Sequence, residues 1–192
     1  MAIILDGNIG VTYPDVTTQN TSAVIGGKLP TTRLPAGSIL QVVSTAKTDT
    51  WSEAVGVGAI SGDATGLTPS ITPATTSNKV LVRGCVFGHV TSNELMLVLY
   101  RNGSAIFVGD TAGNKSRVTG GIDCSNSDEY WGGISFEYLD SPSSTSAVTY
   151  SVRFRHSSGT TRTVYVNRAT TDNDVAGTGR SSSSLTLMEI VA

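Results

Sequence analysis

Residues 95–108 constrain the fold more than any other part of the chain. Two apolar runs of β-prone residues flank Asn102-Gly103. This dipeptide favours a two-residue type I′ turn, because both of its residues adopt positive φ at low cost. The sequence therefore predicts a β-hairpin. With Arg101 opposite Ser104, alternation gives two faces that are both apolar, so the hairpin needs cover on each side from a second sheet or a neighbouring subunit.

The two faces of this hairpin carry different side chains. One face holds Leu97, Leu99, Ile106 and Val108, and the other holds Met96, Val98, Tyr100, Ala105 and Phe107. Alternation alone leaves open which face is core and which is interface. We expect the first face to close the core. We assign Met96, Val98, Tyr100 and Phe107 as the candidate subunit interface.

Length and charge narrow the class of protein. The chain has 192 residues and a mass of 19.9 kDa, which suits one domain with a hydrophobic core and an appendage. Charged residues make up 15% of the chain and the net charge is -2. A basic surface for nucleic acid is therefore not expected. The polar surface must come from Ser, Thr, Asn and Gly, which is typical of β-rich proteins with many turns.

The apolar start of the chain is short. Asp6-Gly7-Asn8 ends the run that begins at Met1, so we expect neither a signal peptide nor a membrane span, and we expect the chain to be made in a cytoplasm. Cys85 and Cys124 are too few and too far apart for a disulfide framework or a zinc site. We expect both to be reduced, small, largely buried side chains.

Residues 1–37 differ from the rest and are predicted to form an arm and linker. Residues 3–5 and 9–13 can pair as a short hairpin, which is marginal alone and needs a partner. Gly26-Gly27, Pro30 and Pro35 then interrupt regular structure. A disordered terminus is the alternative. If the arm docks, the candidate anchor is formed by its apolar residues, namely Ile3, Ile4, Leu5, Ile9, Val11 and Tyr13.

Residues 38–192 read as short strands separated by turn clusters. The expected strands are 39–44, 51–57, 67–71, 79–90, 95–108 as the hairpin, 117–119, 131–139, 147–155, 160–167 and 185–191. In strand 79–90 one face is expected to be core and the other, which is mixed, to be a contact surface; the core face holds Val80, Val82, Val86 and Val90. Strand 147–155 alternates most regularly, with the inward residues Val148, Tyr150, Val152 and Phe154. We expect it to pair with 160–167 across Ser157-Ser158-Gly159. These features predict an all-β fold, an antiparallel β-sandwich that is jelly-roll-like.

Chemistry-bearing residues are sparse and do not form a catalytic or metal-binding pattern. His89 and His156 have no second histidine at ligand spacing. Asp128-Glu129 are adjacent and would point apart, unlike the paired carboxylates of glycosidases. The oxygen-rich run Asp172-Asn173-Asp174 lacks the spaced ligands of an EF-hand loop. We expect no enzyme activity, no metal and no cofactor.

Tyr130 and Trp131 are the candidate residues for stacking on a glycan, because aromatic rings offer large apolar faces at low entropic cost. Burial of Trp131 in the core is the competing interpretation. Of the two interpretations, we favour burial.

Short motifs at both ends resemble one group of proteins. The segment Ile9-Gly10-Val11-Thr12-Tyr13-Pro14-Asp15-Val16-Thr17-Thr18-Gln19 resembles a stretch near the N-termini of bacteriophage tail-fibre and related virion proteins. Leu34-Pro35-Ala36-Gly37-Ser38 resembles the beginning of their β-rich C-terminal domain. Residues 163–168 and 184–190 resemble its end. The family usually has Gly after Pro-Asp, where this chain has Val16.

The resemblance implies a homotrimeric virion appendage. The arm would anchor to other virion proteins, and the β domain would face outward to bind a host surface glycan or protein. Trimerisation is implied by the resemblance alone. A capsid decoration or cement protein, or a head fibre, is the alternative, because the chain is short and has neither a coiled coil nor a collagen repeat. A glycan-degrading spike enzyme is a third hypothesis, weakened by the missing carboxylate pair.

Overall fold

The computed structural model describes residues 34–192 except 92, 126–130 and 177, together with the backbone of three short strands nearer the N-terminus. Those strands are β1 (Ile4–Asp6), β2 (Gly10–Thr12) and β3 (Thr18–Gln19). They form a sheet in the order β1-β2-β3, with Leu5 opposite Val11. The pairing of β1 with β2 agrees with the hairpin predicted near the N-terminus.

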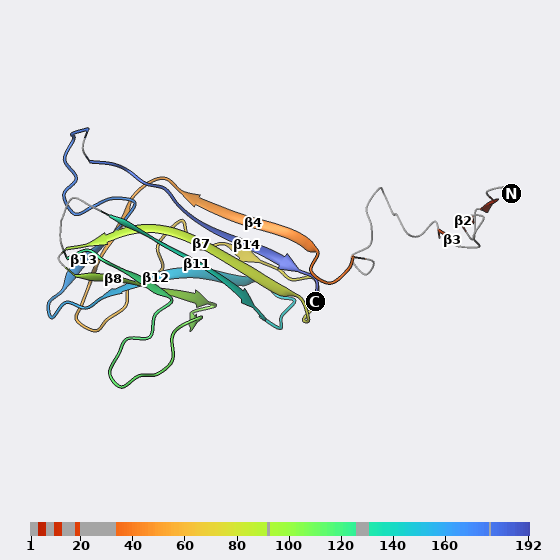
Figure 1. The fold of residues 1–192 in the computed structure, drawn as a ribbon, viewed down its shortest axis with the longest axis horizontal. Helices are drawn as coiled ribbons and strands as arrows, with labels where there is room; N and C mark the ends of the chain where they lie inside the picture. The colour runs from red at the N-terminus through yellow and green to blue at the C-terminus, as the bar shows by residue number, and fades with distance from the viewer. Residues whose placement is uncertain are drawn as a thin grey trace.

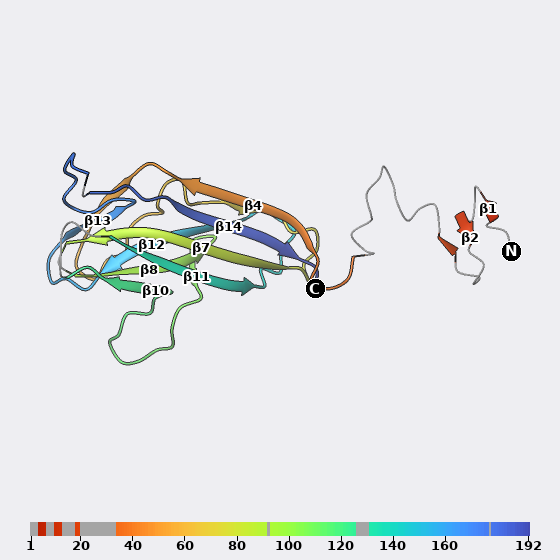
Figure 2. The ribbon, with the colours of Figure 1, turned by 45° about the horizontal axis from the view of Figure 1, so that its top comes forward.

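The described part of residues 34–192 forms two antiparallel sheets packed face to face (Figures 1 and 2). The large sheet contains β4 (Ile39–Lys47), β5 (Trp51–Val55), β7 (Lys79–Val90), β11 (Gly132–Asp140), β13 (Arg162–Val166) and β14 (Ser183–Ile190). The small sheet contains β6 (Ser70–Ile71), β8 (Glu94–Arg101), β9 (Ser104–Ile106), β10 (Gly120–Asp123) and β12 (Val148–His156). The all-β antiparallel sandwich is confirmed, while the jelly-roll pattern stays a prediction.

The hairpin at Asn102-Gly103 forms as expected. Arg101 pairs with Ser104 between β8 and β9, and φ is 46° at Asn102 and 79° at Gly103, as a type I′ turn requires. The Asn102 Oδ1 also accepts the Thr149 N–H at 2.8 Å, which ties the turn to β12.

The core lies between the sheets and settles which face of the hairpin is inside. Leu97 and Leu99 are fully buried. They meet the inward residues of the other long strands, namely Val80, Val82, Val86, Val90, Val148, Tyr150, Val152, Phe154, Leu185 and Leu187. The inward alternation predicted for 79–90 and 147–155 is therefore confirmed.

One inward position of β7 has no side chain, and an aromatic ring fills the space. Gly84 lies opposite Phe136 of β11, and a Cβ added at Gly84 would lie 2.3 Å from the Phe136 ring. The ring therefore lies directly on the glycine backbone, an arrangement that compensates for a glycine in a strand. This contact fixes β11 against β7.

The predicted pairing of 147–155 with 160–167 is wrong. β12 pairs with β8 and β6 in the small sheet, whereas β13 pairs with β5 and β7 in the large sheet. The chain changes sheet after His156, whose Nδ1 accepts the Ser158 N–H at 3.1 Å and whose Nε2 donates to the Val55 carbonyl at 2.9 Å. Alternation cannot distinguish this crossover from a hairpin, because both place apolar side chains inward.

Asn167, directly after β13, forms hydrogen bonds both to the turn between β4 and β5 and to the start of β14. Its φ is 63°, and its Nδ2 donates to the carbonyls of Lys47 and Asp49 at 2.8 Å each. Its Oδ1 accepts the Ser183 hydroxyl at 2.6 Å. These hydrogen bonds hold the bend of the chain between β4 and β5, so that both strands belong to the large sheet.

The chain enters the sandwich beside its own C-terminus. The Gly37 N–H donates to the Val191 carbonyl at 2.8 Å, and the Val191 N–H donates to the Ser38 carbonyl at 2.9 Å. Figure 1 shows the C-terminus and the start of β4 at the same end of the two sheets. We call this the proximal end, and the opposite end the distal end. No helix among the described residues is long and apolar enough to cross a membrane.

Candidate interaction surface

The outer face of the large sheet is built from rows of side chains that cross four strands. A row arises because directly opposite residues on adjacent antiparallel strands point to the same side. β14 pairs with β4 on one side and β7 on the other, and β7 also pairs with β11. Each row therefore contains one residue from each of β4, β14, β7 and β11.

The first row is apolar and exposed. It consists of Val42, Met188, Leu81 and Leu139. Val42 is 56% exposed and Leu139 is 49% exposed, at the two edges of the row. Ile39, 54% exposed, extends this apolar surface toward the proximal end. A contiguous apolar surface on a polar protein marks an interaction site. We call these four residues the apolar row.

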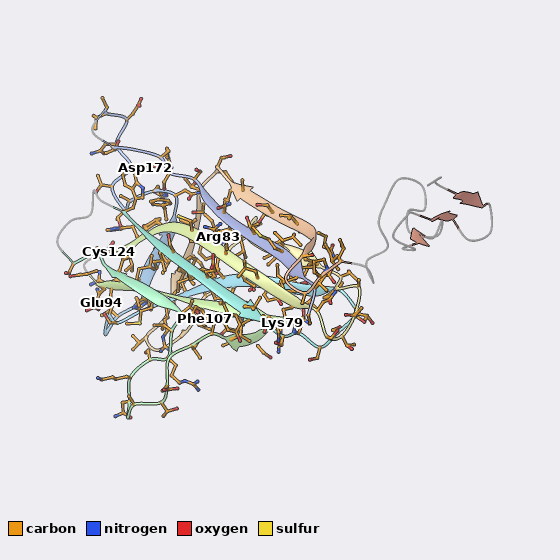
Figure 3. The ribbon with its side chains drawn as sticks, turned by 45° about the vertical axis from the view of Figure 1, so that its right-hand side comes forward. Lys79, Arg83, Glu94, Phe107, Cys124 and Asp172 are labelled. Atoms are coloured by element: carbon orange, nitrogen blue, oxygen red, sulfur yellow. The ribbon has the colours of Figure 1, made fainter. Side chains whose placement is uncertain are left out.

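The second row is polar and is called the ionic row. It consists of Ser44, Thr186, Arg83 and Glu137. Arg83 Nε lies 3.0 Å from Glu137 Oε2 and both side chains are more than half exposed, so the ion pair adds little to the stability of an isolated chain. Figure 3 shows Lys79 and Arg83 on the same strand, β7, with Arg83 further from the proximal end.

The third row is made of small residues and leaves a hollow. It consists of Ala46, Ser184, Cys85 and Ser135. The hollow beside it has a volume of about 460 Å³ and also reaches Arg83, Glu137 and Met188. Cys85 is a half-buried free thiol in this row, whereas Cys124 is buried in the core. Burial raises the pKa of the Cys124 thiol, as for an inert structural cysteine.

A buried carboxylate holds the proximal end together. Glu189 of β14 is only 1% exposed, and its carboxylate accepts hydrogen bonds of 2.6 Å from Gln41 Nε2, Asn78 Nδ2 and the Ala74 N–H. Burial opposes its ionisation, but the three donors outweigh burial and hold its pKa below the ordinary value. The β6–β7 connection is thereby fixed next to β4, where the chain enters the sandwich.

The hairpin residues assigned to a subunit interface have different positions. Met96 is half-buried on the outer face of the small sheet, but Val98 is 2% exposed within the single chain. The Arg153 guanidinium lies over the Tyr100 ring, with its central carbon 4.1 Å from the ring centre. Arg153 also forms an ion pair with Asp63 at 2.7 Å. Val98 and Tyr100 are thus covered by this chain itself.

Phe107 does not share a face with Met96, so that part of the alternation was wrong. β9 ends at Ile106, and Phe107 has a φ of 50°. Its ring stacks on Tyr138 of β11 with centroids 4.7 Å apart. Figure 3 places Phe107 beside the large sheet. The positive φ turns the side chain from the small sheet toward the edge of the large one.

Of the two candidate glycan residues, Trp131 is described, and it lies at the distal end. Tyr130 falls outside the described residues. Trp131 is half-buried, and its ring lies on Gly179, where an added Cβ would be 2.5 Å away. Gly179 belongs to the loop between β13 and β14 that carries Asp172, visible at the distal end in Figure 3. Asp172 pairs with Arg180 at 2.7 Å, so its carboxylate is engaged within the loop.

The candidate anchor lies mostly beyond what the structure describes. Ile4 and Leu5 lie on β1 and Val11 lies on β2, whereas Ile3, Ile9 and Tyr13 are outside the described residues. The anchor stays a prediction. In the described part of the chain, no group of three or more His, Cys, Asp or Glu side chains could hold a metal ion.

The comparisons with known proteins are limited. No protein-family model matches the sequence, and the search of curated proteins gives no match. Solved structures that match include a chain of infectious bursal disease virus, Gt strain, at 14% identity, with 94% of this chain aligned and a TM-score of 0.37. A chain of the Gx strain matches at 15% identity over the whole of this chain, with a TM-score of 0.37. This chain covers 46% and 42% of those chains, respectively.

Proposed function

We propose that this chain is a structural protein of a bacteriophage virion, a trimeric fibre or fibre-like appendage that contributes to attachment to the host surface. It acts by binding and not by catalysis. The N-terminal arm joins it to other virion proteins, and the distal end of the sandwich faces the host.

The apolar row is the observation that carries this proposal. Val42 is 56% exposed and Leu139 is 49% exposed on a regular sheet face, where a lone chain would gain from polar residues. An exposed apolar face stabilises an assembly in which it is buried, and it lowers the solubility of the isolated chain. The arm joins the sandwich at the same proximal end. This supports a protein that is held in a multi-chain particle.

The attachment role is supported by the distal end. If the arm is fixed in the particle, the end away from it is the one that reaches a host surface. Trp131 and the loop around Asp172 lie there. A half-buried Trp ring packed on a polar loop suits a glycan or a protein surface.

A capsid decoration protein or head fibre is the second candidate. The sequence contains neither heptads nor a collagen repeat, the elements from which long fibre shafts are built. Clamping of neighbouring coat subunits would use the same apolar row and the same arm.

Gold-labelled antibody against the chain, viewed on intact virions by electron microscopy, tests the proposal. Label at the tail supports the fibre, and label over the head supports the second candidate instead. Absence of the chain from purified virions contradicts both. Release of new reducing ends from host polysaccharide by the purified chain would contradict the non-enzyme assignment.

A further inference from the structure

The rows on the outer face have a fixed order along the strands. From the proximal end, a row formed by Ile39, Ile190 and Lys79 is followed by the apolar row, then the ionic row, then the small row with its hollow. The apolar, ionic and small rows are two residues apart on each strand, or about 7 Å. The face therefore presents a defined sequence of layers to anything that packs against it.

The arm determines how copies would be aligned. Residues 1–33 of every copy join the sandwich at Leu34, beside the start of β4 and the C-terminus. If the arms share one attachment site in the particle, the copies lie side by side with their proximal ends together. Rows of equal height then face each other, so the apolar rows meet one another and so do the ionic rows.

The charges on the face allow this self-association. The ionic row of each copy carries one cation, Arg83, and one anion, Glu137, on neighbouring strands. When the β4 edge of one copy meets the β11 edge of the next at equal height, Ser44 of one chain lies beside Glu137 of the next, so like charges are not opposed at this contact. The apolar row carries no charge, and the Lys79 ammonium in the row proximal to it donates to Ser141 Oγ of its own chain at 2.8 Å. A second copy of this chain thus matches the face in polarity, row by row.

The edges of the face determine which residues meet. Among the described strands, β4 pairs with β14 alone and β11 pairs with β7 alone, so these two strands are the edges of this face. In a closed ring of three copies the contact is heterologous, with one edge of a face meeting the opposite edge of the next. Val42 is on β4 and Leu139 is on β11.

We propose that three copies pack around a common axis through the outer faces of their large sheets, with Val42 of each copy against Leu139 of the next. The second copy of this chain is the occupant of the exposed apolar row. This assignment rests on the proposed function as a trimer, and it adds the surface through which the three copies contact one another.

A disulfide between neighbouring copies tests the assignment. The chain Val42→Cys/Leu139→Cys is prepared with Cys85→Ser, so that the hollow carries no thiol. Within one copy the two positions are three strand spacings apart, about 14 Å, beyond the reach of a disulfide. Oxidation is expected to give a covalent species of three chains on denaturing gels, which reductant returns to one chain.

A matched pair controls for random collision. Ser135 lies on β11 like Leu139, but in the small row, two rows away from Val42. The chain Val42→Cys/Ser135→Cys/Cys85→Ser misaligns the two thiols by about 13 Å in parallel copies. It is expected to give at most a tenth of the covalent three-chain species at equal protein concentration. Circular dichroism checks that both variants retain the β-sheet spectrum.

Light scattering of the unsubstituted chain separates the possible failures. A mass of three chains with selective cross-linking supports the assignment. A mass of three chains with no cross-link, or equal cross-linking of both pairs, overturns the surface and leaves the trimer intact. A mass of one chain overturns both. If a cysteine variant fails to fold, Leu139→Lys serves instead, and retention of the three-chain mass by that folded variant overturns the surface.

Discussion

The Tyr150 hydroxyl donates a 2.7 Å hydrogen bond to the Asp140 carboxylate and so links the two sheets through their interior. Tyr150 is on β12 of the small sheet, and Asp140 ends β11 of the large sheet. Arg101 of β8 donates to both oxygens of the same carboxylate at 2.9 Å. A buried carboxylate is tolerated here because both of its oxygens have donors. Burial and the bond to Asp140 also raise the pKa of Tyr150.

Tyr150→Phe is expected to lower the free energy of unfolding by about 1–3 kcal/mol, because it removes a donor from a buried carboxylate and leaves the ring in place. Urea denaturation measures this change. Tyr138→Phe is the matched control, since that half-buried ring keeps its stacking on Phe107. Equal, small effects for the two variants would show that the link between the sheets contributes nothing.

Because Glu189 is buried and hydrogen-bonded, we expect the stability of the proximal end to fall in acid. Its folded-state pKa is lowered from 4.5, so its contribution to stability is fully present above the unfolded pKa and is lost as the pH falls through the folded pKa. Glu189→Gln should cost about 1–3 kcal/mol at neutral pH, and should flatten the loss of unfolding free energy below about pH 4.5. Asp110→Asn, at an exposed loop position outside the large sheet, is the control. A pH profile identical to that of the unsubstituted chain would contradict the assignment.

Gly84→Ala tests the contact between the glycine and Phe136. The new methyl group would lie 2.3 Å from the ring, so we expect a loss of about 1–3 kcal/mol from overpacking. Thermal unfolding followed by circular dichroism measures it. Gly109→Ala is the control, because nothing lies within 4 Å of a Cβ there. Recovery of stability in Gly84→Ala/Phe136→Leu would confirm the cause, whereas full stability of Gly84→Ala alone would refute it.

Leu99→Asp is expected to unfold the domain, because an unpaired charge at a fully buried position costs several kcal/mol. Val42→Asp places the same charge on the exposed apolar row and should leave the β-sheet spectrum unchanged. Melting temperatures compare the two. An unchanged melting temperature for Leu99→Asp would mean that the hairpin face has been assigned the wrong way round.

Local chemistry made several elements predictable from the sequence. Asn102-Gly103 gave the turn because few other dipeptides adopt positive φ twice, and the alternating valines of β7 gave its buried face. Strand pairing over long distances was not predictable. The predicted pairing of β12 with β13 was wrong, and the interior position of Asp140 was missed. Both depend on which sheet a strand joins, and alternation carries no such information.

Only part of the interaction surface was visible in the sequence, for a related reason. The outward side of 79–90, which includes Leu81 and Arg83, indicated a contact surface, whereas Val42, Leu139 and Met188 each look like an isolated outward apolar residue in its own strand. They become one row only when the register of four strands is known. Phe107 was misplaced because its positive φ, unusual for a bulky residue, ends the strand at Ile106, two positions before the predicted end at Val108.

The most direct test of the central claim, that the outer face of the large sheet assembles copies of this chain, is a paired mass measurement by light scattering. We predict a mass of three times 19.9 kDa for the unsubstituted chain and of 19.9 kDa for folded Val42→Lys. A mass of 19.9 kDa for the unsubstituted chain, or the same three-chain mass for both, would contradict the account.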